Sequence, residues 1–202
     1  MVEFTYDSTE DIIPSKIITE RMVLEAINYD NCNPRDIYDL YSSVSEEESQ
    51  YVTFNSYDSR IEAKEFIDHA VERFNDGSGA NYMINIPGEQ YEKPFIGTAS
   101  FDPDWEKSIA ESGVFLFKQF WGNGYSTERG EAMIELAFNE MDFDYWISKC
   151  DPRNKGSVGA IENYVVDNGG ERVGVLPNWV VLNDEYTDIL YFKLAREDYE
   201  PN

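Results

Sequence analysis

The segment from Val114 to Phe138, "VFLFKQFWGNGYSTERGEAMIELAF", constrains the fold more than any other part of the chain. Its Asn-Gly pair between aromatic residues is a strong hairpin signal, and a hairpin requires a second strand in which apolar and polar residues alternate. The residues that follow recur instead at helical spacing: Gly130, Met133, Ile134, Ala137, Phe138 and Met141. The pattern therefore predicts a strand, a glycine loop and an amphipathic helix, which starts near Thr127 and Glu128 and closes over 139–141.

A loop of this kind suits a phosphate group. The first turn of a helix presents unpaired N–H groups and a partial positive charge. Gly122 and Gly124 carry no Cβ atom that would keep a phosphate away from the backbone. The alternative is an ordinary tight turn between a strand and a helix, because the segment has neither a Walker lysine pattern nor GxGxxG.

Two further helices are predicted before this segment. One begins at "NPRDIYDLYSSV", with Asn33 as N-cap and Pro34 as the first helical residue. The other begins at a capping box made by Ser59 and Glu62 and ends at "NDG". Its apolar residues form one stripe that we expect to be buried: Ala63, Phe66, Ile67, Ala70, Val71 and Phe74.

Strands are predicted over 16–27, 81–86, 94–101, 113–120 and 144–150, and within 173–181 and 187–194, with a short helix over 157–166. The resulting order is β-α-α-β-β-β-α-β-α-β-β. It indicates a mixed α/β (α+β) layer and differs from a regular βαβ series.

The length of 202 residues suits one domain with its own core. The two cysteines, Cys32 and Cys150, form no CxxC pair, which favours inert thiols in a reducing cytoplasm and no metal site. The first 15 residues are acidic and lack the pattern of a secretory signal. No apolar run approaches the roughly 20 residues that span a bilayer, so we expect no membrane partner.

The net charge of −24 is spread evenly over the chain, and each half carries half of the 40 Asp and Glu residues. A docking patch or an acidic tail would concentrate that charge. The even spread favours a protein from a halophile, with an acidic surface whose self-repulsion is screened by salt. Such a field repels nucleic acid, so we expect no nucleic-acid partner.

Three motifs resemble the GNAT N-acetyltransferase superfamily, and within it the branch of ribosomal-protein N-terminal acetyltransferases. "ITERMVLEAI" is similar to the opening strand of that branch. "WGNGYSTE" looks like the acetyl-CoA loop, with Trp121 in the usual Arg/Gln place. "DPRNKGSVGAIEN" resembles the segment Asn-x-x-Ser-x-x-x-x-Glu-Lys, matched by Asn154, Ser157 and Glu162. The resemblance implies a single domain over 16–198 after an acidic extension over 1–15, with a mixed, mostly antiparallel central sheet flanked by helices on both faces.

The resemblance also implies that acetyl-CoA is the cosubstrate and that an amine attacks it directly, without a metal. The residues that would bind the coenzyme are Val114, Phe115, Leu116, Phe117, Trp121, Gly122, Asn123, Gly124, Tyr125, Ser126, Thr127, Asn154 and Ser157. Among these, the strand residues would bind the pantetheine arm through the backbone, and the loop would bind the pyrophosphate. Ser157 is the candidate proton donor to the leaving thiolate, although a serine at a helix start equally needs no chemical role.

Other catalytic assignments are weaker. The tyrosine that some GNAT branches use as proton donor is replaced by Ile161, and Tyr164 lies one turn later. Candidate bases are loop carboxylates, Asp102, Asp104 or Glu111, or a chain of water molecules. The single histidine, His69, lies on the second predicted helix beside the buried stripe, where a position at the edge of the buried face is a simpler explanation than catalysis.

The segment after Glu162, "NYVVDNGGERVG", departs from the family pattern where the acceptor site is normally walled. The acceptor therefore stays open between a protein N-terminus and a small amine, and the sequence does not give the oligomeric state. The alternatives are a CoA-binding regulatory or scaffold module that has lost catalysis, and a purely structural α/β protein.

Overall fold

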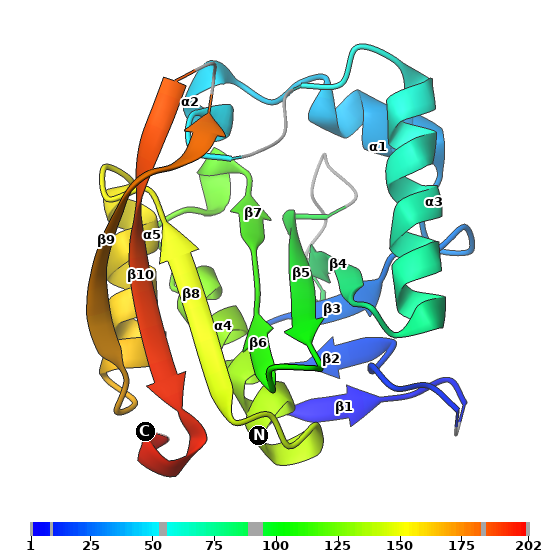
Figure 1. The fold of residues 1–202 in the computed structure, drawn as a ribbon. Coiled ribbons are helices and arrows are strands. Elements are labelled where there is room, and N and C mark those ends of the chain that lie inside the picture. Colours follow the sequence, from blue (N-terminus) through cyan, green and yellow to red (C-terminus); the bar gives the residue numbers. More distant parts are fainter. Residues whose placement is uncertain (1, 9, 53–55, 89–94, 183–184, 201–202) are drawn as a thin grey trace. The chain divides into compact units, whose positions relative to one another are not determined.

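The computed structural model describes residues 2–8, 10–52, 56–88, 95–182 and 185–200 (Figure 1). The chain forms two compact units. Unit 1 comprises Met1–Asp102 and Gly113–Phe120, and unit 2 comprises Pro103–Ser112 and Trp121–Asn202. The chain therefore passes from one unit to the other several times, and each unit has its own part of the sheet.

In unit 1 all strand pairs are antiparallel. The strands are β1 (Glu3–Thr5), β2 (Lys16–Ile18), β3 (Val23–Ala26), β4 (Ala80–Asn85), β5 (Gly97–Asp104) and β7 (Val114–Leu116). They pair in the order β1-β2-β3-β4-β5-β7. Strand β5 runs on beyond Asp102 into unit 2.

The single strand predicted over 16–27 is wrong, because this segment forms the hairpin β2–β3. Met22 N–H donates to the Thr19 hydroxyl over 3.0 Å, and Thr19 N–H donates to the Met22 carbonyl over 2.9 Å. The two charged residues between them, Glu20 and Arg21, are exposed in the turn. The high β-propensity of the flanking residues concealed this turn.

The helices of unit 1 are α1 (Pro34–Tyr41), α2 (Glu46–Ser49) and α3 (Arg60–Asp76). Asn33 caps α1 with Pro34 at the first position, as predicted. The Ser59 hydroxyl caps α3, and Gly77 ends it in the left-handed conformation. Within the predicted stripe, Ala63, Ile67 and Ala70 are buried, while Phe66, Val71 and Phe74 are half-buried.

Unit 2 contains β6 (Ile109–Glu111), β8 (Tyr145–Cys150), β9 (Glu171–Leu182) and β10 (Glu185–Ala195). Strand β6 pairs in parallel with β8, and the pairs β8–β10 and β10–β9 are antiparallel. The helices are α4 (Tyr125–Glu135) and α5 (Lys155–Ile161), and each continues into one wider π-type turn, Leu136–Glu140 and Glu162–Val166. The chain thus has a mixed α/β fold with a mostly antiparallel open sheet flanked by helices, which confirms the predicted class.

Two element boundaries correct the sequence predictions. The strand expected over 113–120 is shorter, because β7 ends at Leu116 and a 3₁₀ turn, Lys118–Phe120, follows. The strand expected over 94–101 begins at Gly97, and Pro94 lies outside the described residues.

The N-terminal 15 residues contain one strand, β1, among those that are described, and it pairs with β2.

Candidate functional site

The glycine loop leads directly into α4. Gly122 and Gly124 have φ angles of 75° and 80°, in the left-handed region that glycine tolerates and other residues rarely adopt. Gly124 is the N-cap of α4, so the helix begins at Tyr125, two residues earlier than predicted, and its cap supplies no side chain. Trp121 to Gly124 are exposed. The loop therefore presents backbone at an exposed helix N-terminus, where anions are favoured.

The strand before the loop contributes its side chains to the interior of unit 1. Phe115 and Phe117 are buried and their rings meet edge-on, with centroids 5.0 Å apart. The Phe115 ring lies 5.8 Å from the ring of Tyr41, whose hydroxyl is 2.7 Å from the Thr98 hydroxyl. β7 pairs with β5 through Gly97 to Ala99. A ligand beside this strand would therefore meet its backbone.

Asn154 and Ser157 come together at the start of α5. The Asn154 Oδ1 atom accepts a hydrogen bond from Ser157 N–H at 3.1 Å, so Asn154 is the N-cap of this helix. Within the described part of the chain, neither the Asn154 side-chain N–H groups nor the Ser157 hydroxyl has a further partner. Both residues are half-buried. One side-chain oxygen thus positions the helix, and the amide and hydroxyl donors can still bind a ligand.

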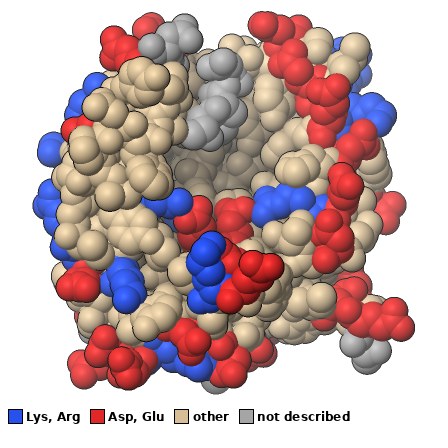
Figure 2. Space-filling model, in the orientation of Figure 1, with Lys and Arg blue, Asp and Glu red and all other residues tan. Residues whose placement is uncertain are grey.

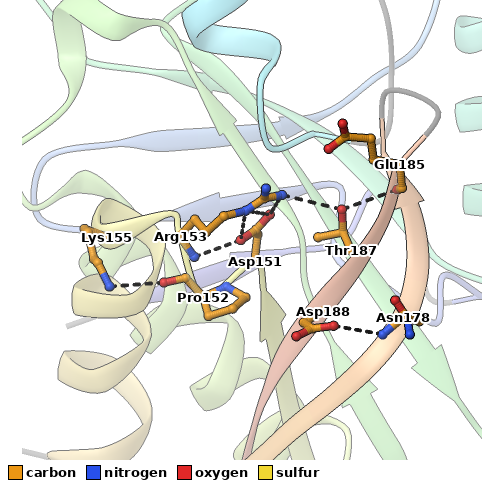
Figure 3. Close-up of polar contacts among 8 residues, drawn as sticks. All are labelled: Asp151, Pro152, Arg153, Lys155, Asn178, Glu185, Thr187 and Asp188. Atoms are coloured by element: carbon orange, nitrogen blue, oxygen red, sulfur yellow. Dashed lines mark hydrogen bonds and ion pairs between the residues drawn. The ribbon is translucent and has the colours of Figure 1, made fainter.

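The residues just before Asn154 form an ion pair that sequence reasoning missed (Figure 3). The Asp151 side chain has no exposed surface, and Arg153 donates to both of its oxygens, from Nε at 3.0 Å and from Nη2 at 2.6 Å. The Arg153 side chain also reaches toward Thr187 on β10, at 3.5 Å. The pair thus ties the connection between β8 and α5 to β10. The only signal in the sequence is the spacing in "DPR", which does not predict burial.

Burial alone would raise the pKa of the Asp151 carboxyl. The hydrogen bonds from the Arg153 side chain and backbone outweigh this effect, and the pKa is lowered overall. Asp151 therefore stays ionised at neutral pH, which suits an anchor for Arg153 and makes it a poor base.

The three candidate bases are each paired with a cation. In unit 1, Asp102 accepts from Arg73 at 2.6 Å. In unit 2, Asp104 pairs with Lys107 at 2.5 Å and Glu111 with Lys149 at 2.7 Å. The Lys107 hydrogen bond lowers the pKa of Asp104.

The tyrosine, histidine and cysteines that the sequence analysis considered have the following surroundings. Tyr164 is buried, and its hydroxyl lies 3.1 Å from the Ser148 hydroxyl. His69 is exposed on α3. Burial raises the pKa of the Cys32 and Cys150 thiols to about 12, so both stay protonated and unreactive at neutral pH.

The described residues contain no group of three or more His, Cys, Asp or Glu residues that could hold a metal ion. Among the helices in the described part of the chain, none is long and apolar enough to cross a membrane. On the face in Figure 2, Asp and Glu side chains form separate groups between larger areas of uncharged residues, and Lys and Arg lie beside several of these groups.

Comparison with known proteins gives a consistent result. The family model "Acetyltransferase (GNAT) domain" matches residues 29–164. The uncharacterized N-acetyltransferase p20 of Bacillus licheniformis is 21% identical over 184 residues, which are 91% of this chain and 97% of that protein.

Solved structures with a similar fold include two acetyltransferases. The microcin C7 self-immunity acetyltransferase MccE, in complex with acetyl-CoA and AMP, has a TM-score of 0.76 at 18% identity, over 92% of this chain and 98% of its own. The ribosomal-protein-S5-alanine acetyltransferase of Vibrio fischeri has a TM-score of 0.74 at 15% identity, over 92% and 99%.

Proposed function

The chain belongs to the GNAT acetyltransferase family and is an acetyl-CoA-dependent N-acetyltransferase, and we propose that its acceptor is a primary amine, either a protein N-terminus or a small amine. The reaction would take place in a ternary complex, by direct transfer. One similar structure is named for a ribosomal protein and its alanine, and another is in complex with acetyl-CoA and AMP, so these names do not select the acceptor of this chain.

The observation that supports the proposed position of the coenzyme is the pair of left-handed glycines before α4. The diphosphate of acetyl-CoA would bind the loop Trp121–Thr127, where Gly122 and Gly124 adopt left-handed backbone angles and Gly124 caps the N-terminus of α4. The pantetheine arm would bind the backbone of residues 114–117. The Asn154 side-chain amide and the Ser157 hydroxyl, which both keep hydrogen-bond donors for a ligand, would contact the pantetheine and the sulfur.

In the reaction, the neutral amine attacks the thioester carbonyl, a C–N bond forms, and the C–S bond breaks. The amine loses one proton and the leaving thiolate gains one. We assign the second proton to Ser157 and the first to water, because Asp104 and Glu111 are each paired with a lysine. Positioning of the two substrates and polarisation of the carbonyl supply most of the rate.

The test has two measurements. The first follows the release of free thiol from acetyl-CoA in the presence of a panel of N-terminal peptides and small amines, and the second measures the binding of CoA by calorimetry. We expect CoA binding and thiol release with at least one class of amine. Binding without release over the whole panel would contradict the proposal and favour a CoA-binding module. The variant Gly124→Asp places a carboxylate in the loop and should abolish CoA binding while the protein stays folded.

A further inference from the structure

Arg129 is a buried cation in unit 2, and no described residue forms an ion pair with it. The side chain lies on the second turn of α4 and is only 1% exposed. Its Nη1 group donates to the Ser112 hydroxyl, and its guanidinium lies 5.6 Å from the ring centre of Tyr164. The buried Nε–H group has no hydrogen-bond partner. Across the described ranges of the chain, no carboxylate pairs with this guanidinium.

This arrangement is unexpected in so acidic a protein. The chain has 40 acidic and 16 basic residues, and three other arginines, Arg73, Arg153 and Arg196, are each paired with an aspartate. A buried charge costs free energy unless it is paired. Among the described residues, Arg129 makes its hydrogen bond and its ring contact with neutral groups: the Ser112 hydroxyl, and the ring of Tyr164, whose hydroxyl is close to that of Ser148. Burial lowers the pKa of the guanidinium, although an arginine remains charged at neutral pH.

The position of Arg129 in α4 indicates a role for its positive charge. It is the fifth residue of α4, and helical side chains lean toward the N-terminus of their helix. Its charge therefore adds to the partial positive charge at Tyr125 and Ser126, where the glycine loop ends. Because water is excluded around it, this charge is screened less than that of a surface lysine.

We propose that Arg129 is a built-in counter-charge for the diphosphate of the coenzyme, which it attracts through the first turn of α4 without touching it. The inference rests on the proposed coenzyme position. It makes Arg129 a positioning residue, and it explains how a chain with a net charge of −24 holds a polyanion: the attracting charge lies in the interior, and the surface stays acidic.

The test compares Arg129→Met, which removes the charge and keeps a long side chain, with Arg129→Lys, which keeps the charge. Calorimetry with CoA should show a dissociation constant at least about tenfold higher for Arg129→Met, and recovery of most of this loss in Arg129→Lys. The effect should persist in roughly 1 M KCl, where surface charges are screened. Transfer from acetyl-pantetheine, which has no diphosphate, should be unchanged.

The same variants separate this role from a structural one. Because Arg129→Met removes an uncompensated buried charge, the melting temperature of the ligand-free protein should stay the same or rise, and the increase on adding CoA should be smaller than in the wild type. The control Arg196→Met changes the net charge equally but removes an ion-paired surface side chain, and it should bind CoA as the wild type does.

A lower melting temperature for Arg129→Met, together with equal losses for CoA and acetyl-pantetheine, would overturn the inference in favour of a structural arginine. Wild-type affinity for CoA in Arg129→Met would overturn it as well and leave the proposed function intact. Failure of the wild type itself to bind CoA would instead refute the proposed function, and this inference with it.

Discussion

At the scale of single residues, the glycine loop offers a matched pair for testing the coenzyme site. Gly122 and Gly88 have φ angles of 75° and 79°, and a Cβ atom built on either meets no atom of a described residue within 4 Å. Alanine at either position should therefore cost a similar backbone strain, about 1 kcal/mol of stability.

Only Gly122→Ala should weaken CoA binding, by about tenfold or more, because only this Cβ would stand between the backbone and the diphosphate. Calorimetric titration of both variants with CoA measures the difference. Equal affinities in Gly122→Ala and Gly88→Ala would exclude Gly122 from the site.

Ser157 can be tested by its effect on rate. The hydroxyl makes no hydrogen bond with another described residue, so Ser157→Ala should leave the melting temperature unchanged. If the hydroxyl protonates the thiolate, kcat should fall by roughly a hundredfold. When transfer to an acceptor is measured at several pH values, this decrease in kcat should be smallest at low pH. An unchanged kcat would leave Ser157 as a helix-start residue only.

Asp151 should give a pH-dependent contribution to stability. Its pKa in the folded protein is lowered, so the stability that it contributes is present above the unfolded pKa of about 3.9 and is lost as the pH falls through the folded pKa. Asp151→Asn should therefore cost about 1–3 kcal/mol near pH 7, and the difference from the wild type should shrink in acid. Urea unfolding at a series of pH values measures it; a difference independent of pH would contradict the ion-pair role.

At the scale of elements, α4 is held close to the turn that follows α5. A Cβ atom built on Gly130 would lie 2.5 Å from the Tyr164 ring, whereas one on Gly159 in α5 meets nothing within 4 Å. The small residue at 130 thus permits the close approach of these two elements.

The two glycines should respond oppositely to alanine. Gly159→Ala should be neutral or stabilise by up to about 1 kcal/mol through helix propensity, while Gly130→Ala should destabilise by about 1–3 kcal/mol through overpacking. Chemical unfolding of both variants gives the two signs. Stabilisation by Gly130→Ala would show that Tyr164 can move away at no cost.

At the scale of the whole molecule, the even acidic charge should make stability depend on salt. With a net charge of −24, repulsion between carboxylates disfavours the compact state, and salt screens it. We expect the melting temperature to rise steadily between low salt and roughly 1 M KCl. A melting temperature that does not change with salt would argue against the halophile hypothesis. The halophile origin stays a prediction, and so do the cytoplasmic location and the division of the chain between residues 15 and 16.

The sequence by itself determined the elements whose signals are local. Asn33 with Pro34, and Ser59 with the apolar stripe up to Gly77, predicted two helices with their caps, since capping and helical periodicity involve residues that are close along the chain. The spacing after Gly124 likewise excluded the hairpin at "WGNGYS". The three motifs then gave the family, which the match over residues 29–164 confirms.

Only the tertiary structure decided which side chains meet across the chain. It divided 16–27 at Thr19 and Met22, buried Asp151 against Arg153, and enclosed Arg129 between Ser112 and Tyr164. Spacing along the chain does not report such contacts, because burial and electrostatic pairing depend on which distant segments lie next to each other. A charged residue in a helix pattern therefore looks exposed in the sequence, and only packing shows that the charge of Arg129 lies inside.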